Sequence, residues 1–242
     1  MANSRGFELL RSAAPTVSIG VVTANLLSLG SEILLLESTG AKLAHFDVMD
    51  GCFCPMMTVG PPFIKAIKTS LLKDVHLMID EPLEKVAEYV TVGADIVTIH
   101  VEACSNVHRV LQKLGTLKNV NDPERGVVRG IALNPGTPLE AIDPLLDEIE
   151  MISLLAVNPG WGGQKYIPST TARIGRVQHM IAGSGKDIIL CVDGGITKDN
   201  IAEIAATGTD LIVTGSAVFD GKAPEANARF MLDTVAAVKA GR

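Results

Sequence analysis

The chain has 242 residues, of which 47% are hydrophobic and 4% aromatic, enough to bury the core of one large domain. Its formal net charge is −6, with acidic and basic residues interspersed, which argues against binding to the phosphate backbone of nucleic acid. The four cysteines form neither a C-x-x-C pair nor a dense disulfide framework, so we expect a protein of the reducing cytoplasm.

A stretch without charged residues lies between Arg11 and Glu32 and is long enough to suggest a signal or membrane segment. It is interrupted by Pro15 and by several small polar residues. We interpret it instead as an interior strand over 16–22, followed by a helix that begins near its N-cap, Asn25. We therefore expect no membrane partner.

Short β-branched or apolar runs alternate with amphipathic segments along the whole chain. The candidate strands cover 16–22, 43–49, 74–79, 95–101, 130–134, 151–157, 187–193 and 210–215. Helical patterns lie at Leu26–Leu36, Pro61–Thr69, Pro82–Val92, Val107–Leu117, Thr170–Ile181 and Asn200–Thr207. This alternation predicts a (β/α)8 TIM barrel, a single domain over 1–242 with residues 1–14 as an N-terminal extension.

The alternative fold is an open, doubly wound sheet. No G-x-G-x-x-G motif follows the first strand, and no G-x-x-x-x-G-K-[ST] motif occurs, so the phosphate loops typical of such sheets are missing. We therefore favour the barrel. The segment 115–130 is rich in Asn, Asp, Pro and Gly, and we interpret it as a long loop that leads into the fifth strand.

Functional residues of a barrel gather where strands end, because the loops that follow share one rim. The polar residues at the predicted strand ends are His45, Asp47, Asp50, His76, His100, Glu102, Asn134, Asn158 and Asp193. Because side chains alternate along a strand, His45, Asp47 and Met49 share one face. The same parity groups His76 with Met78.

Asp193 lies on the same face as Cys191. His45, Asp47, His76 and Asp193 can therefore converge at the top of the barrel, where two imidazoles and two carboxylates suit one divalent ion. Ligand type does not choose among Zn, Fe, Mn and Co. The alternative is four isolated, hydrogen-bonded polar groups, which the matched strand ends disfavour.

Glycine-rich turns follow the last three predicted strands: "NPGWGGQ" at 158–164, "DGGI" at 193–196 and "TGSAVF" at 214–219. Glycines there let backbone N–H groups approach an anion, and a short helix predicted to begin near Ser216 would add its positive end. The turns predict a phosphate site. The alternative is that the glycines serve tight turns only.

Six motifs, "HFDVMDG", "DVHLM", "ALNPGTP", "VNPGWGGQ", "VDGGI" and "GSAVF", resemble those of the ribulose-phosphate 3-epimerase family in order and spacing, over about residues 16–232. The resemblance implies an isomerase of carbohydrate metabolism that converts D-ribulose 5-phosphate to D-xylulose 5-phosphate. It also implies a metal-dependent enzyme, and we expect a homo-oligomer.

The resemblance assigns the metal to His45, Asp47, His76 and Asp193, and acid and base catalysis to Asp47 and Asp193. The substrate contacts that it implies are His76, Gly160, Trp161, Gly162, Gly163, Gly194, Gly195, Gly215 and Ser216. Met49 and Met78 either offer polarisable surface beside the reaction intermediate or belong to the barrel core.

The chemistry explains the need for two carboxylates. Inversion of a carbon next to a ketone removes a proton from one face and delivers another to the opposite face. The enediolate formed between the two steps requires positive charge near its oxygens.

The resemblance is incomplete at the substrate end of the site. The positions that depart from the family pattern are Gly20, Asn25 after Thr23, Cys52, Cys54 and Leu155 or Ala156. We interpret Cys52 and Cys54 as substitutions in the pocket wall. Another substrate, a hexulose 6-phosphate such as allulose 6-phosphate or a tetrulose phosphate, is therefore an alternative.

Two further alternatives are less favoured. A non-catalytic sugar-phosphate-binding barrel would not need the acid and base positions. A lyase or decarboxylase would need a lysine at the strand ends, whereas Lys42 and Lys73 lie at strand starts.

Overall fold

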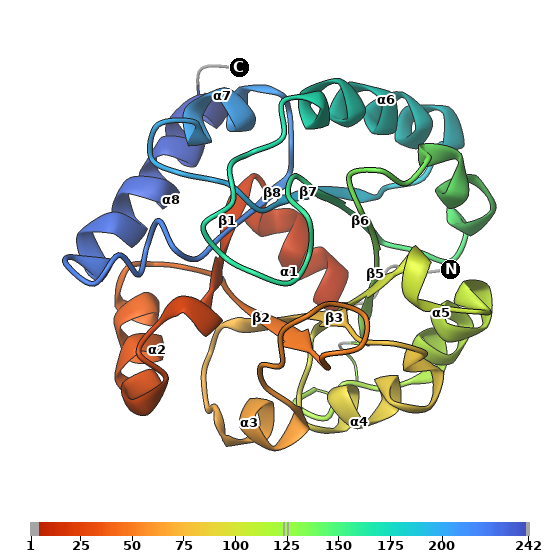
Figure 1. Ribbon diagram of the computed structural model, residues 1–242, viewed down its shortest axis with the longest axis horizontal. Coiled ribbons are helices and arrows are strands. Elements are labelled where there is room, and N and C mark those ends of the chain that lie inside the picture. Colours follow the sequence, from red (N-terminus) through yellow and green to blue (C-terminus); the bar gives the residue numbers. More distant parts are fainter. Residues whose placement is uncertain (1–4, 123, 125, 241–242) are drawn as a thin grey trace.

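The structure is a computed structural model that describes residues 5–122, 124 and 126–240. Its parallel strands follow one another in chain order around a closed barrel, and β8 pairs with β1 (Figure 1). In that closing pair Thr16 lies opposite Leu211 and Ile19 opposite Thr214. The closure confirms the predicted (β/α)8 barrel and excludes the open, doubly wound sheet.

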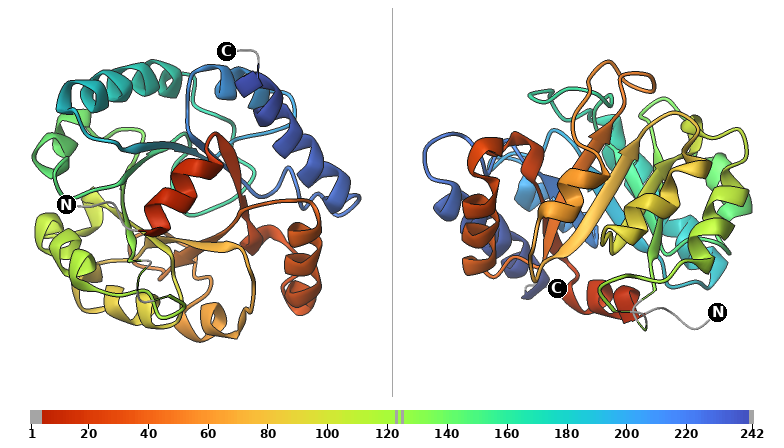
Figure 2. Two further views of the ribbon diagram at one scale, coloured as in Figure 1. Left: turned by 180° about the vertical axis from the view of Figure 1, so that it is seen from behind. Right: turned by 90° about the horizontal axis from the view of Figure 1, so that it is seen from below.

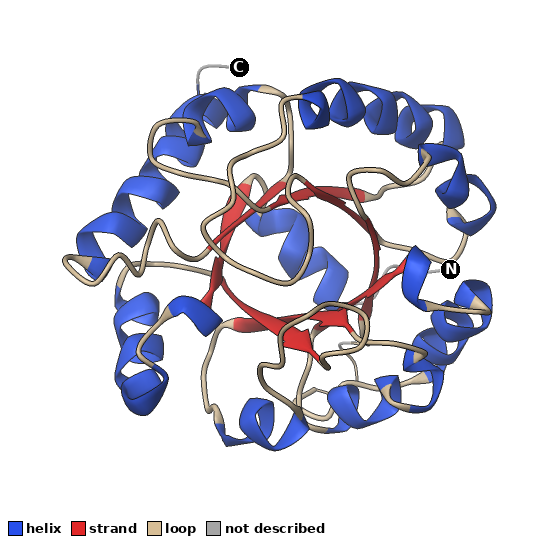
Figure 3. Ribbon diagram, in the orientation of Figure 1, coloured by secondary structure: helices blue, strands red, loops and turns tan. Residues whose placement is uncertain are grey.

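Helices surround the strands on the outside of the barrel (Figure 3). The strands are β1 Thr16–Gly20, β2 Leu43–Met49, β3 Leu72–Met78, β4 Ile96–His100, β5 Val128–Leu133, β6 Met151–Leu155, β7 Ile189–Asp193 and β8 Leu211–Thr214. The outer helices are α2 Leu29–Ser38, α3 Pro61–Ala66, α4 Val86–Thr91, α5 Val107–Thr116, α6 Ser169–Ser184, α7 Ile201–Ala206 and α8 Pro224–Ala240.

Short 3-10 helices occupy several connections. They are η1 Val21–Thr23, η2 Leu26–Ser28, η3 Pro82–Glu84, η4 Val101–Ala103 and η5 Leu139–Leu145. Asn25 caps η2 as predicted, since its side chain accepts a hydrogen bond from the N–H of Leu27 (3.2 Å). The sequence patterns did not predict η5, which contains Pro144, a residue that cannot donate a helical hydrogen bond.

The short helix predicted near Ser216 is wrong. The chain makes a single turn there, in which the N–H groups of Val218 and Phe219 both donate to the carbonyl of Gly215 (2.9 and 3.0 Å). It then bends again, because a side-chain oxygen of Asp220 accepts hydrogen bonds from the N–H groups of Lys222 and Ala223 before α8 begins. The glycine turn at 214–219 is therefore not followed by a helix that begins near Ser216.

The charge-free stretch near the N-terminus forms β1, η1, η2 and the start of α2, which confirms its interpretation as strand and helix. Within residues 5–122, 124 and 126–240, no helix combines the length and the apolar character needed to cross a membrane.

Helix α1, Arg5–Ala13, lies across the end of the barrel where the strands begin, as the two further views show (Figure 2). Phe7 and Leu10 are fully buried there among inward-facing residues of the strands, such as Leu43, Leu72 and Ile189. The helix closes this end of the barrel with apolar side chains.

We expect Leu10→Ala to lower the free energy of unfolding by about 2–5 kcal/mol, because it leaves a cavity under the barrel floor. Urea denaturation measures the change. Leu9→Ala on the same helix is the matched control; this side chain is 40% exposed, and its loss should cost within about 0.5 kcal/mol. Equal effects of the two substitutions would contradict the role given to α1.

Alternation along β2 sets the direction of the polar side chains. Phe46 and Val48 pack in the apolar layer between strands and helices, whereas Leu43 packs inside the barrel. His45 and Asp47, which share the parity of Leu43, therefore point inward.

Candidate active site

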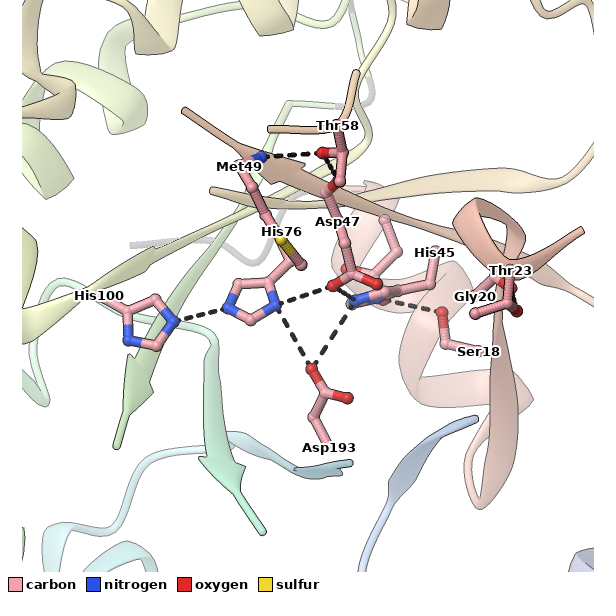
Figure 4. Close-up of polar contacts among 11 residues, drawn as sticks. Ser18, Gly20, Thr23, His45, Asp47, Met49, Thr58, His76, His100 and Asp193 are labelled. Carbon is pink, nitrogen blue, oxygen red and sulfur yellow. Dashed lines mark hydrogen bonds and ion pairs between the residues drawn. The ribbon is translucent and has the colours of Figure 1, made fainter. Parts of the chain in front are cut away.

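Four side chains meet inside the barrel near the ends of the strands. His45 and Asp47 come from β2, His76 from β3 and Asp193 from β7, and they point toward one another (Figure 4). Each offers a ligand atom, and these atoms all lie within 4.8 Å of one another. The structure thus brings together the group predicted from strand parity, and this group could hold a metal ion.

Two contacts show how well the group fits a cation. His76 Nδ1 lies 3.4 Å from Asp47 Oδ1 and 3.3 Å from Asp193 Oδ2. This nitrogen is buried and has no hydrogen-bond partner among the described residues. Buried polar atoms in proteins nearly always have a partner, and a divalent ion between the carboxylates and the imidazole would supply one.

The charges of the group stabilise one another. Burial disfavours the charged form of Asp47, but His45 and His76 outweigh it and hold the pKa of this carboxyl well below its usual range. Burial also disfavours a charged His76, but Asp193 and Asp47 outweigh it and raise its pKa to about 9. The carboxylate of Asp47 is therefore ionised.

Ser18 and Asp74 orient His45 from below. Asp74 Oδ2 lies 2.7 Å from His45 Nδ1 and accepts a hydrogen bond from the Ser18 hydroxyl (2.8 Å). A carboxylate only accepts, so Nδ1 carries a proton, and Nε2, 3.2 Å from Asp47 Oδ1, is the nitrogen that a metal ion would use. Sequence reasoning missed both residues, although Asp74 shares the inward parity of His76.

A second set of contacts leads from His76 toward β4. His76 Nε2 lies 2.8 Å from His100 Nε2, and His100 Nδ1 lies 3.1 Å from Glu102 Oε2. Burial lowers the pKa of His100 to about 4, so this imidazole is neutral at physiological pH. Sequence reasoning placed His100 and Glu102 on the rim but gave them no role.

A cavity of about 670 Å³ opens above the metal group. Apart from His45, which lies beneath it, all predicted site residues line it: Asp47, Met49, His76, Met78, Gly160, Trp161, Gly162, Gly163, Asp193, Gly194, Gly195, Gly215 and Ser216. Thr58, Asn158 and Asn200 add polar groups to the wall. The cavity has room for a small phosphorylated ligand.

The reason for a glycine differs from one position of the cavity wall to another. Gly195 has φ 70°, and a Cβ atom there would lie 2.5 Å from the backbone nitrogen of Tyr166. A Cβ atom at Gly215 would lie 2.8 Å from Thr23 Oγ1. Tight turns and close packing therefore explain these two. Gly162 has neither a positive φ nor an atom within 4 Å of its missing Cβ, so its backbone is open to a ligand.

The interpretation of Cys52 and Cys54 as pocket wall is wrong. Neither thiol lines the cavity. Cys52 is exposed to solvent, whereas Cys54 is buried. Cys54 packs against Gly160, where an added Cβ atom would lie 3.0 Å from the Cys54 Cβ. Asp50 holds this loop in place, because its Oδ1 accepts hydrogen bonds from the N–H groups of Cys52 and Phe53. Met56 and Thr58 are the residues of this loop that reach the cavity.

Some of the other residues that depart from the family pattern line the cavity, and one does not. Gly20, Thr23 and Leu155 line the cavity, whereas Asn25 serves as the cap of η2. Lys73 is buried near the start of β3, where its Nζ donates to the carbonyl of Ile64 (2.8 Å). It lies at the opposite end from the cavity, as predicted.

Comparison with known structures supports the fold. KGPDC from Streptococcus mutans, solved in complex with D-R5P, aligns with a TM-score of 0.67 and 14% identity, over 93% of this chain and 98% of that chain. The 3-hexulose-6-phosphate synthase from Salmonella typhimurium aligns with a TM-score of 0.66 and 17% identity, over 92% of this chain and 99% of that chain. At these identities the likeness shows the barrel fold alone.

Comparison with known sequences identifies the family of the chain. The model of the ribulose-phosphate 3 epimerase family matches residues 16–219. Ribulose-phosphate 3-epimerase of Bacillus subtilis (strain 168) is 40% identical over 206 residues, 84% of this chain and 91% of the relative. The enzyme of the same name from Escherichia coli (strain K12) is 38% identical over 208 residues, 84% of this chain and 88% of the relative. The chain belongs to the ribulose-phosphate 3-epimerase family.

Proposed function

We propose that the chain is a metal-dependent 3-epimerase that converts D-ribulose 5-phosphate to D-xylulose 5-phosphate. The observation that carries the proposal is the placement of Asp47 and Asp193. They reach the same point from β2 and β7, on opposite sides of the barrel, at the floor of the cavity (Figures 1 and 4).

His45, Asp47, His76 and Asp193 would hold the metal. A bound divalent ion supplies positive charge where negative charge develops on the substrate oxygens. One aspartate takes the proton from C3, and the other delivers a proton to the opposite face of the same carbon. The low pKa of Asp47 keeps it ionised before the proton arrives.

Other residues of the cavity hold the substrate around this pair. The open backbone at Gly162 and the turns at Gly194, Gly195, Gly215 and Ser216 provide a place for the phosphate. Met49 and Met78 line the cavity beside the two aspartates and give the intermediate a surface that offers no competing proton.

Three finer expectations belong to the proposal. Zn, Fe, Mn and Co all suit a site of two imidazoles and two carboxylates. A cytoplasmic location agrees with four cysteines that are free thiols. A homo-oligomer remains a prediction.

A 3-epimerase of another ketose phosphate is the second candidate. It is favoured by the departures that line the cavity, Gly20 and Leu155, because they change the surface that the substrate would meet. Neither belongs to the metal group, so the reaction itself would be unchanged.

The test is a screen of the metal-loaded protein with D-ribulose 5-phosphate, allulose 6-phosphate and a tetrulose phosphate. Epimerisation and exchange of the C3 hydrogen with solvent deuterium are followed together. We expect the highest kcat/KM for D-ribulose 5-phosphate. A higher value for another sugar would favour the second candidate, and a metal-bound protein without C3 exchange on any of them would end the epimerase proposal.

A further inference from the structure

A buried series of polar contacts runs outward from the metal group. His76 and His100 are 1% and 0% exposed, and their Nε2 atoms are 2.8 Å apart. Two nitrogens at this distance share one proton, so one of them donates and the other accepts. The direction of this hydrogen bond decides which nitrogen of His76 is free to bind a metal.

Glu102 fixes the outer end of the series. Its Oε1 accepts hydrogen bonds from the N–H of Asn134 (2.8 Å) and from the Thr137 hydroxyl. Arg173 of α6 in turn donates to the carbonyls of Thr137 (2.8 Å) and Asn134 (3.2 Å). The other carboxylate oxygen, Oε2, is thereby held toward His100.

The directions of the hydrogen bonds follow from the outer end inward. A carboxylate only accepts, so His100 Nδ1 donates to Glu102. His76 Nδ1 makes no hydrogen bond to any described residue, although Asp47 and Asp193 lie 3.4 and 3.3 Å away, so the proton that His76 donates is on Nε2. His100 Nε2 therefore accepts from His76 Nε2, so a divalent ion bound beside Asp47 and Asp193 would meet His76 at Nδ1.

We propose that His100 and Glu102 are positioning residues that hold the proton of His76 on Nε2 and thereby keep Nδ1 available for the metal. The inference rests on the proposed metal-dependent function. It also explains why the two histidine ligands present different nitrogens. Asp74 contacts His45 directly at Nδ1, whereas Glu102 acts on His76 through a second imidazole.

The sharpest variant is Glu102→Gln, which is nearly the same size. Its single carbonyl oxygen is required by Asn134 and Thr137, so its NH2 group faces His100 Nδ1. With a donor there, His100 Nδ1 becomes the acceptor and His100 Nε2 donates to His76 Nε2. The proton of His76 then lies on Nδ1. We expect a ten- to hundredfold weaker affinity for Zn2+, measured by competition with a chelator.

Glu81→Gln is the matched control. Glu81 lies in the loop after β3 on the same rim, and its Oε1 accepts hydrogen bonds from the N–H and hydroxyl of Ser105, with no imidazole involved. We expect it to leave the Zn2+ affinity unchanged. An equal loss of Zn2+ affinity in Glu81→Gln and Glu102→Gln would show that the loss of one negative charge is enough to weaken binding. That result would overturn the inference.

The proton positions can be observed directly. Long-range 1H–15N spectra of the zinc-loaded wild-type protein should show His76 protonated at Nε2, and His45 and His100 at Nδ1. A proton on Nε2 of His100 would overturn the inference, whether or not activity is present. A wild-type protein that binds no divalent ion would instead overturn the proposed function.

A second pair of variants covers the case in which Glu102→Gln does not fold. His100→Gln keeps an acceptor within reach of His76 Nε2, whereas His100→Phe removes it and keeps a ring beside Phe53. We expect the glutamine variant to bind Zn2+ within a few-fold of the wild type and the phenylalanine variant to lose ten- to hundredfold. Equal affinities in the two variants would contradict the role of His100.

Discussion

Replacing Asp193 with asparagine is expected to lower kcat/KM for C3 epimerisation by about a thousandfold, the contribution of a positioned acid or base. Asparagine keeps the size and one oxygen of aspartate but cannot accept and return a proton. The side chain lies on the cavity floor, with Oδ2 3.3 Å from His76 Nδ1. Steady-state kinetics with each epimer measures the loss.

The same variant tests the division of labour between the two aspartates. If Asp47 still acts alone on one face, only one epimer should exchange its C3 hydrogen with solvent. Asp147→Asn is the control, because this side chain is 81% exposed and pairs with Lys186 (2.6 Å) away from the site. Substantial epimerisation by Asp193→Asn would contradict the two-aspartate scheme.

Removal of the metal should have an effect of similar size. We expect dialysis against a chelator to lower kcat/KM by about a thousandfold or more, because the charge that stabilises the intermediate is lost. Zn, Fe, Mn or Co added back should restore activity. The metal content and the rate are measured on the same samples, together with the far-UV spectrum to show that the barrel remains folded.

Two histidine variants separate this site from weak binding at the surface. His45→Gln should abolish stoichiometric metal binding, since His45 is 4% exposed and lies within the metal group. His108→Gln, at a side chain that is 53% exposed, should leave it unchanged. Full activity in the chelator-treated protein at undetectable metal content would contradict a metal-dependent reaction.

Much of the candidate site could be predicted from the sequence, because strand periodicity and strand ends are local properties. Alternation along "LAHFDVM" placed His45 and Asp47 on one face, and Phe46 and Val48 on the other. The predicted helix boundaries were less accurate. The pattern at Pro82–Val92 divides into η3 and α4, and the predicted helix near Ser216 is a turn.

Side-chain contacts between residues of neighbouring strands that lie far apart in the sequence could not be predicted in this way. Ser18 and Asp74 orient His45 from β1 and β3, and His100 and Glu102 reach His76 from β4 and the turn after it. Cys52 and Cys54 looked like pocket residues by their place after the motif. Hydrogen bonds from their loop to Asp50 direct it so that Met56 lines the cavity instead.

The sequence by itself determined the barrel, the inward faces of β2, β3 and β7 and the four groups of the candidate metal site, because these follow from period and order along the chain. Only the tertiary structure decided which atoms of those groups face one another. The register between strands sets Asp47 opposite His76 and His45 opposite Asp74. That register is fixed by the closed barrel, and it brings His45 and His76 to the polar side chains that contact their rings.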